Sequence, residues 1–218
     1  MVKRKNKTVL LLGCGSGKFG QELIKQYQQN NWDVHCMGSA APEECTLYKV
    51  DWNNITVKQV NNIANSLPEL DAVVFAHNGG YAINSDHFKN NTLTEYDLTA
   101  WDVSNWVITQ MPAYLITRLE YKLKKSSKIC WLLGWGTVNA PKNDPIWQYI
   151  GYGICKTNAF MLMRCIAQVH PSICYAVDPG DIKEENMQSI ANSLYNLQQT
   201  VSRSDAGKAF NIDLSEIY

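Results

Sequence analysis

Short apolar runs alternate with longer amphipathic stretches along most of the chain. Residues 7–12 end in an unbroken apolar run, which is typical of a parallel strand buried on both faces. Further strands are expected at residues 33–37, 46–50, 72–76, 128–133, 173–177 and 210–214. Apolar positions at helical spacing predict helices at residues 17–30, 57–67, 97–124, 150–170 and 184–199.

This alternation of strand and helix predicts an α/β fold, a doubly wound parallel sheet of the Rossmann type with helices on both faces. No internal repeat or linker divides the 218 residues, so we expect a single domain over residues 1–218, with disorder at residues 1–6. The longest stretches without a periodic pattern, 76–92 and 134–147, directly follow strands. Ligands bind at that edge of an open parallel sheet, so we expect the functional site there.

Composition narrows the classes of partner. Lys+Arg and Asp+Glu are both 20, and this balance argues against a nucleic acid or an anionic membrane as partner. No apolar run is long enough for a signal peptide or a membrane span. The seven cysteines are scattered, several of them in apolar segments, and no spacing suits a metal site. We therefore expect a cytoplasmic protein that acts on a small-molecule substrate and holds no metal.

The first strand and the first helix are joined by a glycine-rich segment. Gly15, Gly17 and Gly20 form the pattern Gly-x-Gly-x-x-Gly, in which backbone N–H groups at a helix start can approach a phosphate. The segment is also similar to the first motif of S-adenosylmethionine-dependent methyltransferases, although Leu11 stands where those enzymes carry an acid. The cofactor-binding residues expected in this segment are Gly13, Gly15, Ser16, Gly17, Lys18, Phe19 and Gly20.

The second strand ends without the carboxylate that usually holds the ribose of NAD. Gly38 and Ser39 occupy this end, and an acid here would repel a 2′-phosphate. The missing carboxylate favours NADPH over NADH. Lys18 and the Ser39 hydroxyl are candidate contacts of the 2′-phosphate.

A tyrosine and a lysine four positions apart lie on a predicted helix, at Tyr152 and Lys156. Residues at this spacing share a helix face, where the ammonium can favour the phenolate and make the phenol a useful proton donor. Tyr121 and Lys125 have the same spacing but lie in a lysine-rich helix end, which is typical of a solvated surface. Context therefore selects Tyr152 and Lys156 as the catalytic candidates.

Together these features resemble the short-chain dehydrogenase/reductase family, and the resemblance extends from the glycine loop to the turn at Pro179. In that family an aspartate after the third strand contacts adenine, an Asn-Asn-Ala-Gly signature follows the fourth strand, and a Pro-Gly turn covers the nicotinamide. The resemblance assigns further cofactor contacts to Asp51, Trp52, Asn78, Gly79, Gly80, Pro179 and Gly180, besides Tyr152 and Lys156.

The chain departs from the family in two places. The family serine after the fifth strand is missing, with Thr137 as the candidate replacement, and Thr109 lies nearest to the family's helix asparagine. The dihydropteridine reductases are a subgroup without that serine, and the segment Ile150-Gly-Tyr-Gly-Ile-Cys-Lys156 resembles them most specifically. Candidate substrate-binding residues are Tyr81, which follows Gly79-Gly80 as the subgroup's pterin-pocket aromatic does, and Trp135, Thr137 and Trp147.

The resemblance implies NAD(P)H-dependent reduction of a quinonoid dihydropteridine to the tetrahydro form, with Tyr152 as proton donor and Lys156 as the group that tunes it. Other planar carbonyl or imine substrates fit the same chemistry. Three alternatives stay open: a generic NADPH carbonyl reductase of the same family, a non-catalytic dinucleotide-sensing regulator, and a methyltransferase.

The two longest predicted helices, 97–124 and 150–170, carry more apolar residues than one core-facing stripe needs. A second apolar face usually has a second partner, so we expect the helices to pair with symmetry mates in a homodimer. The residues that suggest this face are Trp101, Trp106, Val107, Met111, Phe160, Met161, Met163 and Ile166.

Overall fold

The computed structural model describes residues 6–15, 17–77, 98–134, 150–180 and 182–212. Within these residues, seven strands form one sheet in the order β3-β2-β1-β4-β5-β6-β7, and every neighbouring pair is parallel. The strands are β1 Thr8–Leu12, β2 Asp33–Gly38, β3 Thr46–Lys49, β4 Leu70–Phe75, β5 Leu123–Leu132, β6 Ile173–Asp178 and β7 Ala209–Asn211. The predicted doubly wound α/β fold is confirmed.

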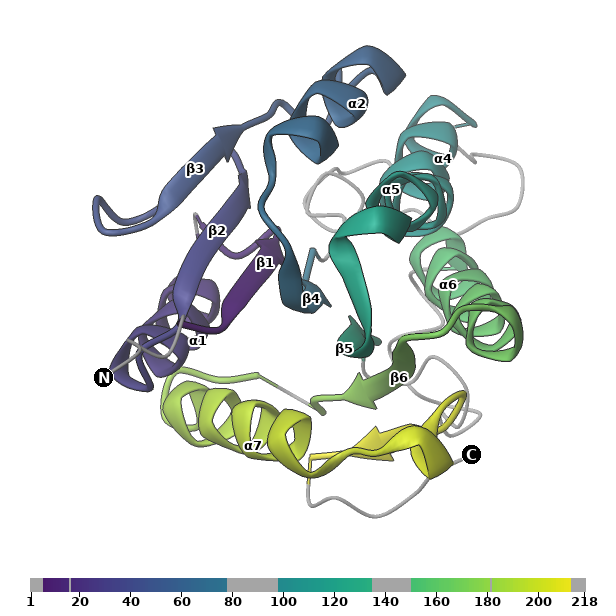
Figure 1. The fold of residues 1–218 in the computed structure, drawn as a ribbon. Coiled ribbons are helices and arrows are strands. Elements are labelled where there is room, and N and C mark those ends of the chain that lie inside the picture. The colour runs from purple at the N-terminus through teal and green to yellow at the C-terminus, as the bar shows by residue number, and fades with distance from the viewer. Residues whose placement is uncertain (1–5, 16, 78–97, 135–149, 181, 213–218) are drawn as a thin grey trace.

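Helices cover both faces of the sheet (Figure 1). Helices α1 (Lys18–Gln29) and α7 (Met187–Thr200) pack side by side on one face. The other face is covered by α2 (Val57–Ser66), α4 (Leu98–Asn105), α5 (Met111–Leu119) and α6 (Ile150–Val169).

The continuous apolar run near the start of the chain forms strand β1, which is buried on both faces. Leu10 and Leu12 pack on the α2 and α5 side, whereas Val9 and Leu11 pack on the α1 and α7 side. All four side chains are fully buried, because successive strand residues point to opposite faces and both faces are covered by helices.

The order of the strands reverses at β1. The chain builds β1, β2 and β3 outward on one side, then crosses back to place β4 on the other side of β1. In folds of this type, ligands bind at the carboxyl ends of the strands where the strand order reverses.

The helix predicted over residues 97–124 is confirmed over most of its length and is wrong only at its end. Helix α4 passes through a π-helical turn, Trp106–Gln110, into α5, and the helical segment ends in a 3₁₀ turn, Glu120–Lys122. Pro112 has no N–H to donate to the previous turn, which accounts for the wider turn before it. Strand β5 then begins at Leu123, well before the predicted residue 128.

The apolar surplus of the long helices is partly explained by the chain's own core. Val107, Met111, Phe160 and Met163 are buried beneath the helices and need no partner chain, so the argument for a second face does not hold for them. Met161 is half exposed, at 51%.

Strand β5 bulges where it pairs with β4, because the register shifts between Leu70 and Ala72. The buried Ser127 closes the bulge. Its Oγ donates to the Leu70 carbonyl at 2.7 Å and accepts from the Lys124 backbone N–H at 2.8 Å. One hydroxyl thus satisfies two backbone groups that the irregular ladder leaves without strand partners.

Ser127→Ala should lower the free energy of unfolding by about 1–3 kcal/mol, since a buried carbonyl and a backbone N–H both lose their hydrogen bonds. Urea unfolding followed by circular dichroism measures the change. The exposed neighbour Ser126 provides the control, and Ser126→Ala should leave the midpoint unchanged. Equal midpoints for the two variants would contradict this role for Ser127.

Candidate active site at the carboxyl edge of the sheet

The glycine loop connects β1 to α1 and is packed backbone against backbone. A Cβ on Gly15 would lie 1.3 Å from the Ala40 carbonyl oxygen, and one on Gly20 would lie 1.8 Å from the Cys14 carbonyl oxygen. Neither neighbour can move aside, because both are main-chain atoms. These two glycines are therefore required by the fold itself.

Gly17 differs from the other glycines of the loop. A Cβ at this position would meet nothing within 4 Å. Gly17 precedes α1 with extended backbone, and no side chain caps the helix start. An uncapped helix start with open space beside it suits an anionic ligand.

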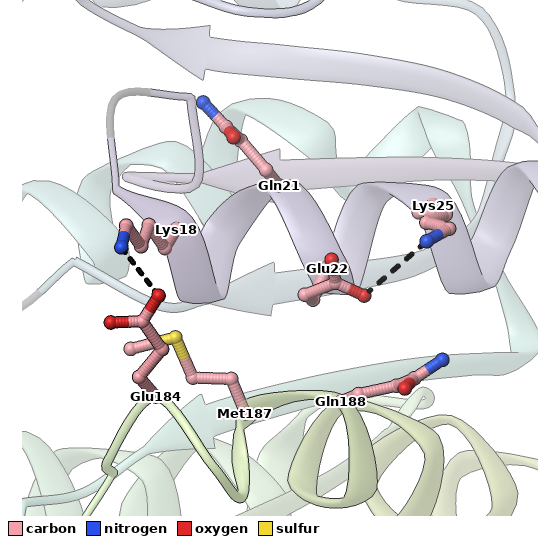
Figure 2. Close-up of a pocket in the computed structure, with 7 residues that line it drawn as sticks. All are labelled: Lys18, Gln21, Glu22, Lys25, Glu184, Met187 and Gln188. Atoms are coloured by element: carbon pink, nitrogen blue, oxygen red, sulfur yellow. Dashed lines mark hydrogen bonds and ion pairs between the residues drawn. The ribbon is translucent and has the colours of Figure 1, made fainter.

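Lys18 is the first residue of α1, and its ammonium forms an ion pair with the Glu184 carboxylate, Nζ to Oε1 2.7 Å (Figure 2). The two groups lie on facing walls of a shallow pocket between α1 and the segment that leads into α7. Both side chains are largely exposed, at 67% and 75%, so the pair contributes little to stability and can exchange partners. A role for Lys18 at a phosphate stays a prediction.

The end of β2 faces the glycine loop. Gly38 is buried, and a Cβ on it would lie 3.6 Å from the Ala40 carbonyl oxygen and 3.9 Å from the Gly15 nitrogen. A Cβ therefore fits at Gly38 and would lie beside the loop. The next residue, Ser39, is exposed, so its hydroxyl is accessible as the sequence analysis requires.

Asp51, the expected adenine contact, caps its own turn. Its carboxylate accepts from the Asn53 backbone at 3.0 Å and from the Asn54 side chain at 2.7 Å, and these hydrogen bonds lower the pKa of Asp51. The group is fully exposed. Its contact with adenine stays a prediction.

His77 follows β4 and is a buried residue that the sequence analysis did not single out. Its Nε2 donates to the Val107 carbonyl at 2.6 Å, and its ring stacks on Trp52 with centroids 5.4 Å apart. Burial and the nearby Lys156 lower the pKa of His77 to about 3, so the ring is neutral. A histidine directly after a buried strand was the available signal for this residue.

Lys156 lies on α6, and its side chain is only 2% exposed. Its ammonium donates to the Leu132 carbonyl at 2.8 Å and to the His77 carbonyl at 3.3 Å, so it joins the carboxyl ends of β5 and β4. Burial lowers the pKa of Lys156 to about 8, although the Asp178 carboxyl opposes the shift. A partly desolvated cation of this kind is typical of a functional site.

Asp178 ends β6 and is a second residue that the sequence analysis passed over. Its Oδ1 accepts from the Gly180 N–H at 3.0 Å, which shapes the Pro179-Gly180 turn. Burial raises the pKa of Asp178, while Lys156 acts in the opposite direction. The carboxylate is the acidic group that compensates the buried ammonium. An acid at the end of a buried strand was the signal.

Of the two catalytic candidates, the side chain of Lys156 is described and that of Tyr152 is not. Tyr152 lies on α6 one turn before Lys156, as predicted, but its side chain falls outside the described residues. Tyr121 and Lys125 lie on the surface, as predicted, but they do not share a helix. Tyr121 lies in the 3₁₀ turn and is 93% exposed, while Lys125 is an exposed residue of β5. The other predicted site residues outside the described part of the chain are Ser16, Asn78, Gly79, Gly80, Tyr81, Trp135, Thr137 and Trp147.

Thr109 lies in the π-helical turn, and its hydroxyl donates to the Cys155 carbonyl at 3.1 Å. Cys155 immediately precedes Lys156, so this bond ties the turn to the part of α6 that carries the buried lysine. π-Helical turns occur frequently at functional sites.

The described residues also limit the class of site. Among residues 6–15, 17–77, 98–134, 150–180 and 182–212, no group of three His, Cys, Asp or Glu side chains is placed to hold a metal ion. In the same part of the chain, no helix has the length and apolar character needed to cross a membrane.

No protein-family model matches the chain, and no curated protein matches it. Solved structures do. A carbonyl reductase from Pseudomonas aeruginosa PAO1 in complex with NADP is similar at 14% identity and a TM-score of 0.77, over 97% of this chain and 99% of that one. A short-chain dehydrogenase/reductase from Burkholderia multivorans with bound NADP is similar at 14% identity and 0.75, over 98% and 99%.

An oxidoreductase of the short-chain dehydrogenase/reductase family from Brucella ovis, in complex with a partially ordered NAD, is similar at 16% identity and a TM-score of 0.70, over 95% of this chain and 99% of that one. At such identities the likeness concerns the fold. The chain has the Rossmann-type fold of the short-chain dehydrogenase/reductases over nearly its whole length.

Proposed function

We propose that this protein is an NAD(P)H-dependent reductase of the short-chain dehydrogenase/reductase type. The observation that carries the proposal is the buried Lys156 ammonium, which lies at the carboxyl edge of the sheet one helical turn after Tyr152. A structural lysine gains nothing from such burial, since desolvation disfavours its charge. The non-catalytic regulator is less favoured because it needs neither residue.

The described residues fit a dinucleotide. The open space at Gly17 and the uncapped start of α1 suit a pyrophosphate. Similar structures hold NADP or NAD, which supports a nicotinamide cofactor over S-adenosylmethionine. The cofactor, when bound, supplies the hydride. We favour NADPH because the end of β2 carries Gly38 in place of an acid, with Ser39 and Lys18 as the proposed partners of a 2′-phosphate.

In this proposal Tyr152 supplies the proton, and Lys156 makes the phenol a better donor. With a pKa of about 8, Lys156 is mostly charged at neutral pH. Its positive charge favours the phenolate of Tyr152 and so lowers the cost of releasing the phenolic proton to the substrate. The carbonyls of Leu132 and His77 hold the ammonium in place. Tyr152 is the proposed catalytic acid.

We propose a quinonoid dihydropteridine as the substrate. The proposal is supported by the segment around Tyr152 and Lys156 and by the missing family serine. A quinonoid pterin is already electron-poor, so it needs little polarisation from a serine hydroxyl. Tyr81, Trp135 and Trp147 are the proposed aromatic contacts of the planar ring, with Thr137 as a polar contact. The second candidate is carbonyl reduction, favoured by the similar carbonyl reductase from P. aeruginosa.

We further propose that the protein works as a homodimer. Of the apolar residues that suggested a second helix face, Met161 is exposed, and Ile154 lies two helical turns before it on the same α6 face and is 40% exposed. These two exposed apolar side chains support the proposal. The homodimer would have a mass of about 50 kDa, twice the 24.7 kDa of one chain.

Tyr152→Phe tests the proposed chemistry. With NADPH and a quinonoid dihydropterin, turnover should fall by roughly 10²-fold or more, since a proton donor is lost with little change in volume. The absorbance of the nicotinamide measures the rate. Tyr121→Phe is the matched control and should leave turnover unchanged, because that tyrosine is 93% exposed. Full activity of Tyr152→Phe would remove this tyrosine from the mechanism.

Gly17→Val should abolish dinucleotide binding while the protein stays folded, because its side chain enters open space where the backbone would meet a pyrophosphate. Quenching of tryptophan fluorescence measures the affinity for NADPH, NADH and S-adenosylmethionine, and thermal unfolding checks the fold. Gly20→Ala is the contrast, since its Cβ meets the Cys14 carbonyl and should destabilise the fold. Normal NADPH affinity in folded Gly17→Val would place the ligand elsewhere.

Gly38→Asp should shift cofactor preference from NADPH toward NADH by roughly tenfold or more, because a carboxylate beside the glycine loop accepts ribose hydroxyls and repels a 2′-phosphate. A Cβ at Gly38 has no contact below 3.6 Å. The ratio of kcat/KM for the two cofactors measures the shift. A strong preference of the wild-type protein for NADH would refute the assignment of NADPH.

A further inference from the structure

Two ion pairs of different kinds lie in the pocket of about 330 Å³ between α1 and the segment that leads into α7 (Figure 2). Glu22 and Lys25 are both on α1, three positions apart, with Nζ to Oε2 at 3.8 Å. The Lys18 ammonium instead meets the carboxylate of Glu184, 166 positions later in the sequence, at 2.7 Å. The second pair therefore joins two separate elements of the fold.

The turn before α7 brings Glu184 to α1. The Asn186 side chain accepts from the Lys183 backbone N–H at 2.7 Å, and the Asn186 backbone N–H donates to the Lys183 carbonyl at 3.1 Å. Ile182, just before this turn, packs against the cluster of buried residues on the α1 side of the sheet. The backbone is thus anchored on both sides of Glu184, so the carboxylate meets Lys18 from a defined position.

The charge of Lys18 is already used by a carboxylate at the place where the proposed cofactor would bring its phosphates. Lys18 follows Gly17, beside which a Cβ would meet nothing within 4 Å. The first turn of α1 carries no acid of its own, so Glu184 supplies an anion to this helix start from a distant part of the chain. A carboxylate and a phosphate are both anionic acceptors of a lysine ammonium, so the two compete for the same group.

We propose that Glu184 sets the affinity for the cofactor by competing with a cofactor phosphate for Lys18. This inference rests on the proposed function, because it requires a dinucleotide at the glycine loop. When the dinucleotide binds, the Lys18 ammonium leaves the carboxylate and pairs with a phosphate oxygen. When the dinucleotide leaves, the carboxylate takes the ammonium back. The exchange is noncovalent and transfers no proton.

The exposure of the two side chains decides how large the effect is. Lys18 and Glu184 are 67% and 75% exposed, and ion pairs at such exposure hold their partners weakly. A phosphate can therefore displace the carboxylate. The apparent affinity of a ligand is reduced by the fraction of molecules in which its site is available, so removing the competing carboxylate should raise the affinity by about two- to fivefold.

Quenching of tryptophan fluorescence by NADPH and by NADH at low ionic strength measures the dissociation constants. Glu184→Gln should bind NADPH about two- to fivefold more tightly than wild type, and this gain should shrink at high salt because the ion pair is exposed. Glu185→Gln is the matched control. Glu185 is the next residue, is exposed and carries the same charge, so the affinity of this variant should equal that of wild type.

Variants of Lys18 show whether Glu184 acts through this lysine. Lys18→Met should weaken NADPH binding, and adding Glu184→Gln to Lys18→Met should bring no gain, because no ammonium is left to compete for. A gain with NADPH alone identifies the 2′-phosphate as the partner of Lys18, whereas an equal gain with NADH identifies the pyrophosphate, and both results support the competition. Thermal unfolding should be unchanged in every variant, since the pair is exposed.

The results that overturn this inference differ from those that overturn the proposed function. Wild-type affinity in Glu184→Gln, in a protein that binds NADPH, would refute the competition and leave the proposed function standing. The same gain with and without Lys18 would also refute it, because the carboxylate would then act on the phosphate directly. Failure of wild type and all variants to bind either NADPH or NADH would refute the proposed function and this inference with it.

Discussion

Backbone crowding at the carboxyl end of β1 is the constraint on which the candidate site depends. A Cβ on Gly13 would lie 2.4 Å from the Cβ of His77, and Gly13 adopts a φ of 77°, which L side chains rarely take. Gly15 meets the Ala40 carbonyl in the same way. The ends of β1, β2 and β4 therefore touch through main chain, and the packing requires glycine before any ligand is considered.

His77 contacts both the crowded glycine and the buried lysine. The residue that presses on Gly13 also offers its carbonyl to the Lys156 ammonium, and its ring is held by the Val107 carbonyl and by stacking on Trp52. The glycine loop and the lysine are thus two sides of one packed unit. A shift of His77 would change both its packing against Gly13 and its hydrogen bond with Lys156.

The two faces of the sheet carry different chemistry. The α1 side holds the glycine loop, whereas the α6 side holds Lys156 and the π-helical turn with Thr109. The two sets meet where the order of the strands reverses, at the carboxyl ends of β1 and β4. An elongated ligand laid across this edge would contact both faces, as expected for a doubly wound sheet.

Local patterns in the sequence determined the strands, most helix positions, the glycine loop and the spacing of Tyr152 and Lys156, because period and glycine placement report burial and turns between near neighbours. Only the tertiary structure decided where the helix after residue 97 ends, since β5 exists through its pairing with β4 and β6. It also revealed His77 and Asp178 as neighbours of the buried Lys156. Desolvation and backbone acceptors arise from segments distant in the sequence, and no local pattern encodes them.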